Sequence, residues 1–165
     1  LITLTLFFSA NSAATEKEYM LKAGFLYNFA RFAHWVTPTY HNNNFTLCSP
    51  DKSFIDIADV ALTKRNIQKR PLINKHISLE PNSIKLCDMV FITSKTYANW
   101  KSTPNLTYKN ILLVGENDGF IESNGHIRFF LSSGKVRFEI SPNNLKIDGL
   151  TMSSKVLRLA RIVDG

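Results

Sequence analysis

Apolar and polar residues alternate along the chain in patterns that predict helices and strands in turn. Residues 15–35 place apolar side chains on almost every face of a helix, and Thr15 with Glu18 forms a capping box at its start. A helix that is apolar on all sides is buried on more than one side. Two interpretations stay open. One is a central core helix, and the other is a helix that meets a second subunit or a partner through Phe25, Tyr27, Phe29 and Phe32.

The rest of the chain continues as short strands separated by helices. A continuous apolar run at 87–93 is typical of a strand that is covered on both faces, whereas 72–79 alternates like a half-buried strand. Ser133 and Gly134 predict the turn of a hairpin. Strands are predicted at 45–48, 72–79, 87–93, 111–114, 126–131 and 136–140, and helices at about 50–61, 95–101, 142–146 and 153–163.

Strand–helix–strand alternation followed by a hairpin favours a particular architecture. We expect an α/β three-layer sandwich, with a mixed, mostly parallel sheet of about six strands and helices on both faces. No linker-like stretch interrupts residues 15–165. The sequence therefore predicts a single domain over this range.

Residues 1–14 resemble the remnant of a secretory signal. An uncharged apolar run, LITLTLFF, precedes a small and polar stretch with Ser12 and Ala14 at the small-residue positions of a cleavage site. The initiator Met and a basic segment are missing, so we expect a truncated N-terminus. A buried strand or a membrane anchor is the alternative, although eight residues are too few to span a bilayer. We expect an exported protein that is peripheral to a membrane at most.

Export changes the interpretation of the two cysteines. Cys48 and Cys87 are an even pair, and in an oxidising compartment such a pair favours a disulfide. Two unrelated buried thiols are the alternative. The four histidines are scattered without ligand spacing and there is no CxxC motif, so we expect neither a metal nor a cofactor.

Motifs of the common enzyme classes are absent from the sequence, and we expect no catalytic residues. The group that most resembles an active site is Glu116, Asp118 and Glu122. These residues lie in a Gly- and Asn-rich loop, where carboxylates are ordinarily solvated turn residues. The net charge of +7 is spread along the chain, and export would separate it from DNA, so we expect no nucleic acid partner.

Charged residues in the last third leave two questions. Glu139 lies within an apolar strand and needs a partner such as Lys155 if it is buried, or else it faces solvent. Lys155, Arg158 and Arg161 recur every three residues on the predicted last helix. They form a solvated face, which we favour, or a basic strip that docks an acidic partner.

Short motifs occur along the chain in a fixed order. The first helix carries a Lys-Ala-x-x-Leu-Tyr-Asn-Phe-Ala-x-Phe core at 22–32, and Cys48 and Cys87 follow. The later motif residues are Gly115, Glu116, Gly119, Phe120, Arg137, Phe138, Glu139, Ser153 and Lys155. In this combination the chain resembles the YfiR-like family of periplasmic proteins over about 18–163. It departs from that family's pattern at residues 123–125, where paired glycines are usual, and it lacks a second cysteine pair that some members have.

The resemblance implies a non-enzymatic periplasmic signalling regulator that forms a homodimer. Such a regulator binds the periplasmic sensor region of a membrane diguanylate cyclase and represses it, which lowers cyclic di-GMP and so bears on biofilm formation. An outer-membrane lipoprotein relieves the repression by sequestering the regulator, and the redox state of the cysteines bears on its folding. The alternative is a periplasmic small-molecule-binding sensor, with a pocket lined by Tyr97, Phe120, Phe129 and Phe138.

Overall fold

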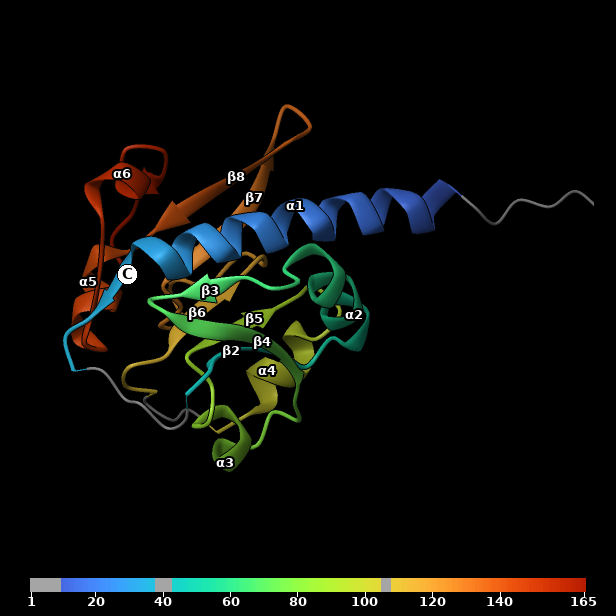
Figure 1. The fold of residues 1–165 in the computed structure, drawn as a ribbon. Helices are drawn as coiled ribbons and strands as arrows, with labels where there is room; N and C mark the ends of the chain where they lie inside the picture. The colour runs from blue at the N-terminus through green and yellow to red at the C-terminus, as the bar shows by residue number, and fades with distance from the viewer. Residues whose placement is uncertain (1–9, 38–42, 105–107) are drawn as a thin grey trace, which may run out of the picture.

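The computed structural model describes residues 10–37, 43–104 and 108–165 (Figure 1). An eight-stranded sheet in the order β10-β8-β7-β6-β5-β2-β4-β3 forms its centre. Five neighbouring strands run parallel to one another. They are β4 (Arg70–His76), β2 (Phe45–Ser49), β5 (Met89–Ile92), β6 (Leu112–Gly115) and β7 (Ile127–Ser132).

Three further strands complete the sheet at its two ends. β8 (Lys135–Ile140) pairs antiparallel with β7 through a turn at Ser133 and Gly134, which have φ values of 51° and 73°. This confirms the predicted hairpin, because a tight turn of this kind needs positive φ at both central residues. β3 (Asn66–Ile67) and β10 (Arg161–Ile162) are two-residue edge strands. The mixed, mostly parallel α/β sheet is confirmed, and these two strands raise the strand number above the expected six.

Helices pack on both faces of the sheet and create two separate cores. On one face α1 (Ala10–Phe32) and α2 (Lys52–Ala61) bury Phe29 and Phe54 in the same core cluster as Phe91. On the other face α3 (Pro81–Ile84) and α4 (Tyr97–Ser102) cover the cluster around Val90 and Phe120. α1 crosses the whole molecule in Figure 1. In the described part of the chain, no helix is long and apolar enough to span a membrane.

α1 differs from its predicted bounds at both ends. It already begins at Ala10, so Thr15 lies inside the helix and is not its N-cap. It ends at Phe32, because Ala33–Trp35 forms β1, which pairs antiparallel with β9 (Leu150–Met152). Trp35 is buried there and donates a hydrogen bond from Nε1 to the Asn110 carbonyl at 3.0 Å. Pairing with a distant strand therefore outweighs the helical pattern of these residues.

The predicted last helix is also shorter than expected. α5 (Pro142–Ile147) forms as predicted, but α6 stops after one turn, Ser154–Leu157. The chain then extends into β10, which runs parallel to β8, and Val163 donates a backbone hydrogen bond to Ile140. The expectation of one helical face bearing Lys155, Arg158 and Arg161 is therefore wrong, since Arg161 lies in a strand.

Candidate functional site

Polar side chains gather where three neighbouring parallel strands end. β2 is followed by Asp51, β5 by Thr93 and Ser94, and β6 by Glu116. The chain leaves β2 to one side for β4 and returns on the other side at β5, so the β2–β5 boundary is the switch point of the sheet. In open α/β sheets this is the usual position of a ligand crevice. These residues therefore form the candidate site.

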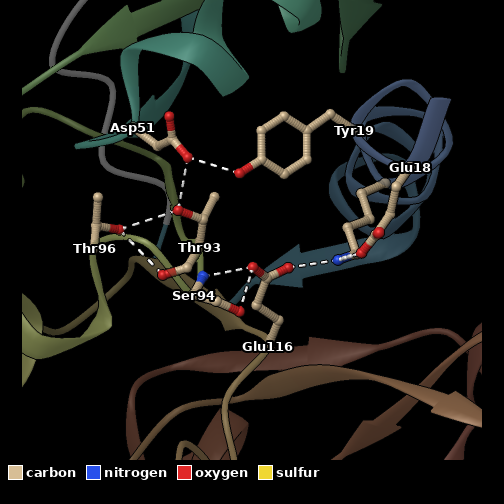
Figure 2. A network of polar contacts seen from close by, with 8 residues as sticks. Glu18, Tyr19, Asp51, Thr93, Ser94, Thr96 and Glu116 are labelled. Carbon is tan, nitrogen blue, oxygen red and sulfur yellow. Dashed lines mark hydrogen bonds and ion pairs between the residues drawn. The ribbon is translucent and has the colours of Figure 1, made fainter. Parts of the chain in front are cut away.

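The N-terminal half of α1 lies over this position (Figure 2). Tyr19 donates a hydrogen bond from its hydroxyl to Asp51 Oδ2 at 2.8 Å, and the Thr93 hydroxyl donates to the same oxygen at 2.8 Å. The other oxygen of Asp51 caps α2 and accepts from the amides of Ser53 at 3.0 Å and Phe54 at 3.3 Å. One carboxylate thus joins α1, α2 and the end of β5.

The protonation states of this pair are set by its surroundings. Burial raises the pKa of Tyr19, and the hydrogen bond to Asp51 raises it further. Burial alone would raise the pKa of Asp51, but hydrogen bonds from Ser53, Tyr19 and Thr93 outweigh it, and the net pKa is lowered. At neutral pH Tyr19 is therefore protonated and donates the hydrogen bond, and Asp51 is ionised and accepts it. This hydrogen bond is a structural contact and not an acid–base pair.

Glu116 forms the second half of the strand-end cluster. Its Oε2 accepts from Lys22 Nζ at 2.5 Å, and its Oε1 accepts from the Ser94 amide at 2.5 Å and the Ser94 hydroxyl at 2.8 Å. Lys22 is only 4% exposed and also pairs with Glu18. Both oxygens of Glu116 are occupied by donors within the chain. Figure 2 shows this network between α1 and the strand ends.

The structure does not bring the three loop carboxylates together. Glu116 is bound to Lys22 and Ser94, while Asp118 is exposed and pairs with Arg128 at 2.8 Å. Glu122 is exposed and lies beside a cavity on the other side of the sheet. Asp118 and Glu122 are therefore the solvated turn residues that the loop composition predicts, whereas Glu116 departs from that prediction because it is nearly buried and paired with Lys22.

Glu139 is buried and has two arginine partners. Arg128 Nε donates to its Oε1 at 2.6 Å, and Arg161 Nε donates to its Oε2 at 2.9 Å. Burial alone would raise the pKa of Glu139, but hydrogen bonds from these arginines lower it overall. Lys155 is not the partner, since it lies exposed on α6 beside Phe32. The neighbouring Arg137 is exposed and Phe138 is core.

The disulfide between Cys48 and Cys87 is present in the structure. Cys48 is in β2 and Cys87 comes just before β5, the adjacent strand, with 6.0 Å between their Cα atoms. Both cysteines are buried in the core on the α3–α4 face. The bridge therefore joins the two strands on either side of the switch point, on the face opposite α1.

The Gly115–Phe120 motif has a packing explanation. A Cβ on Gly115 would lie 2.5 Å from the Phe120 ring, and one on Gly125 would lie 2.2 Å from it. Gly119 has a φ of +81°, which L side chains rarely adopt. The glycines therefore let the loop after β6 fold back and insert Phe120 fully into the core. Asn124, at the unusual position of the motif, takes a φ of 71°.

The motif residue Ser153 is the N-cap of α6 and accepts a hydrogen bond from the Lys155 amide at 3.3 Å.

The sequence profile of the YfiR/HmsC-like family matches residues 19–161. The chain belongs to this family. The matched region extends from Tyr19, which joins α1 to the strand ends, to Arg161, which holds Glu139. No curated protein matches the chain.

The four residues expected at an interface of this YfiR/HmsC-like protein do not share one environment. Phe29 is 1% exposed and packs on Phe129 and Phe138 at centroid distances of 5.7 and 4.9 Å, so its side chain belongs to the core. Phe25 and Phe32 are partly buried and line a groove of about 220 Å³ together with Leu159, which is 72% exposed. The part of the expected interface that stays accessible is therefore Phe25, Phe32 and, on the other flank of α1, Tyr27.

The four aromatic residues expected to line one small-molecule pocket lie on two faces of the sheet. Tyr97 and Phe120 belong to the core under α4, whereas Phe129 and Phe138 belong to the core under α1. The sheet separates the two pairs, so that expectation is wrong. A different cavity, of about 560 Å³, lies between Trp100, Tyr108, Asn144 and Asp148.

The residues that the sequence missed lie mainly in α1 and at the strand ends. Asp51 and Thr93 belong to no motif, although they follow apolar strands closely. Tyr19 and Lys22 lie in the predicted first helix, and Lys22 begins its motif, but the sequence predicts no polar partner for either. His126 was also missed: it is fully buried, accepts from the Leu113 amide at Nδ1 and donates from Nε2 to Asp148 at 2.8 Å. Among the described residues no group of His, Cys, Asp and Glu could hold a metal ion.

Proposed function

We propose that this chain is an exported, non-enzymatic regulator that binds the periplasmic part of a membrane diguanylate cyclase and represses it. The observation that carries the proposal is membership of the YfiR/HmsC-like family over residues 19–161. The polar groups at the strand ends are satisfied within the chain, which fits a protein that acts by binding. Repression then means that the regulator binds the inactive conformation of the sensor region more tightly than the active one.

The groove beside α1 supports a protein partner. Phe25, Phe32 and Leu159 form an apolar surface, and Lys155 lies above the Phe32 ring at 6.0 Å. Interfaces commonly have an apolar centre and a polar rim of this kind. We propose this groove as the contact with the cyclase, and a homodimer as the functional form. An outer-membrane lipoprotein that takes the same surface would relieve the repression.

The buried disulfide supports an oxidising compartment. Cys48 and Cys87 are bonded in the core, and such bonds persist in the periplasm but are rare in the cytosol. We propose export to the periplasm on this basis together with the apolar run at residues 1–8, which lies outside the described residues.

Replacement of Leu159 tests the groove. We expect Leu159→Asp to abolish complementation of a host strain that lacks the gene, so that cyclic di-GMP stays high. Leu131→Asp is the matched control, because Leu131 is similarly exposed, at 65%, but lies on the β7–β8 hairpin. Equal cyclic di-GMP with both variants, at equal protein amounts, would remove the groove from the proposal.

The cavity between Trp100 and Tyr108 supports a second function, a periplasmic small-molecule sensor. Its volume of about 560 Å³ lies within the range of ligand pockets, and it combines aromatic walls with Asn144 and Asp148. A thermal-shift screen of small periplasmic metabolites tests it: a ligand that raises Tm should fail to do so with Trp100→Ala.

A further inference from the structure

The outer face of α1 is apolar and basic together. Met20 and Leu21 are 45% and 50% exposed, and Lys17 and Arg31 are exposed on the same side of the helix. The opposite side carries the buried residues, among them Lys22. An exposed helix side that combines large apolar residues with cations is typical of helices that lie in a membrane interface.

Two arginines converge on one tyrosine at the edge of this face. The guanidinium of Arg31, from α1, lies 5.4 Å from the centroid of the Tyr27 ring, and that of Arg65 lies 5.4 Å from the same ring. Within the described ranges neither arginine forms an ion pair. Two like charges are thus held beside one ring without a carboxylate, an arrangement that an anion between them stabilises.

The neighbouring hairpin extends the positive surface. Residues 60–79, which contain β3 and β4, have no Asp or Glu, and Lys64 and Lys69 are exposed on either side of β3. Two acidic side chains lie near the start of α1: Glu16 is exposed beside Lys17, and the partly exposed Glu18 pairs with Lys22. We call the surface formed by Lys17, Met20, Leu21, Tyr27, Arg31 and Arg65 the basic helix face.

We propose that the basic helix face docks the protein on an anionic phospholipid membrane. Phosphodiester groups would pair with Arg31 and Arg65, Tyr27 would lie at the headgroup level, and Met20 and Leu21 would enter the upper acyl region. A second copy of this chain is a poor occupant, because the same cations would face each other across a two-fold axis. This inference does not rest on the proposed cyclase. The basic helix face adjoins the groove, since Arg31 also lies 5.5 Å from the centroid of the Phe32 ring.

Vesicle co-sedimentation of the oxidised protein tests the proposal. The probes are vesicles of phosphatidylethanolamine with 30% phosphatidylglycerol, vesicles of phosphatidylcholine alone, and polyglutamate peptide immobilised on beads that sediment. We expect binding to the phosphatidylglycerol vesicles at low salt, loss of binding in 0.5 M NaCl, and no comparable binding to phosphatidylcholine or polyglutamate. Arg31→Gln with Arg65→Gln should lower the partition coefficient about 30-fold, the factor that about 1 kcal/mol for each cation gives.

The matched control removes the same charge elsewhere. Lys85→Gln with Lys135→Gln removes two exposed cations, one at the C-cap of α3 and one at the start of β8, and should lower binding far less. Circular dichroism and the intact disulfide show that each variant is folded. An equal loss of vesicle binding in both double variants would mean that binding depends on net charge alone, and this result would overturn the proposal. Failure to bind phosphatidylglycerol vesicles, or equal binding to polyglutamate, also overturns it, the latter in favour of an acidic protein partner.

Discussion

Tyr19 of α1 donates a hydrogen bond to Asp51, the N-cap of α2, across 2.8 Å at the switch point of the sheet. Together with the Lys22–Glu116 pair, this contact places α1 over the position where related sheet architectures hold a ligand. The chain's own helix fills that position. The free energy of unfolding of the protein should therefore depend on these contacts more than on polar pairs elsewhere on the surface.

Removal of the Tyr19 hydroxyl should destabilise the protein. Tyr19→Phe keeps the ring, which packs edge-on against Phe54, but deprives a buried carboxylate of one donor. We expect the free energy of unfolding to fall by about 1–2 kcal/mol, as measured by urea unfolding of the oxidised protein. Tyr97→Phe is the control: its hydroxyl makes an exposed bond of 3.2 Å to the Asp118 carbonyl, and a loss below about 0.5 kcal/mol is expected. Equal losses would contradict a special role for Tyr19.

The buried pair of Lys22 and Glu116 should show strong coupling. Lys22→Met leaves Glu116 charged and nearly buried, and we expect a loss of about 3 kcal/mol. Adding Glu116→Gln should recover part of that loss, because the unpaired charge is removed. The exposed Lys52–Asp56 pair, treated with the same substitutions, should show coupling of about 0.5 kcal/mol or less. Additive effects at Lys22 and Glu116 in this double-mutant cycle would argue against the pair.

The sequence predicts a strand correctly where the side chains on both faces of that strand are apolar. β5 (Met89–Ile92) is buried along its whole length, and its continuous apolar run predicted it. β3 and β10 were not predictable, because two residues are too few to carry a period. Ala33–Trp35 continued the apolar pattern of α1, and only its pairing with β9 decides that it is a strand.

The candidate site was predictable only in part. The sequence marks Glu116 as a loop carboxylate, but its partner Lys22 is 94 positions away, and no local pattern connects the two. The sequence predicts that Glu139 needs a partner if it is buried, but its pattern places Arg161 in a helix, whereas the structure places Arg161 in β10 beside Glu139. Long-range pairing of this kind depends on the topology of the sheet, which pattern alone does not define.

The disulfide should provide a large part of the stability. Cys48→Ser with Cys87→Ser removes a cross-link over a sequence separation of 39, and we expect a loss of about 2–5 kcal/mol in urea unfolding. Mass spectrometry of the alkylated, non-reduced protein should find both cysteines unmodified. Alkylation of both in the folded, isolated protein would contradict the bridge.

Acid should weaken the protein through Glu139. The arginines lower the pKa of Glu139 in the folded state below its ordinary value of 4.5, so the unfolded chain binds a proton at Glu139 first as pH falls. The contribution is complete above about pH 4.5 and disappears as pH falls further, through the folded pKa. In urea unfolding between pH 6 and 2.5, Glu139→Gln should flatten the acid side of the stability profile. The exposed Glu122→Gln should keep the wild-type slope, and equal slopes in all three proteins would contradict this origin.

The central claim is repression of a cyclase, and cellular cyclic di-GMP measures it most directly. The comparison is between the native host, a strain without this gene, and that strain carrying the gene again. We predict a clear rise in cyclic di-GMP on deletion and a return to the original level on complementation. An unchanged cyclic di-GMP level after deletion, in cells that normally export the folded protein, would contradict the account.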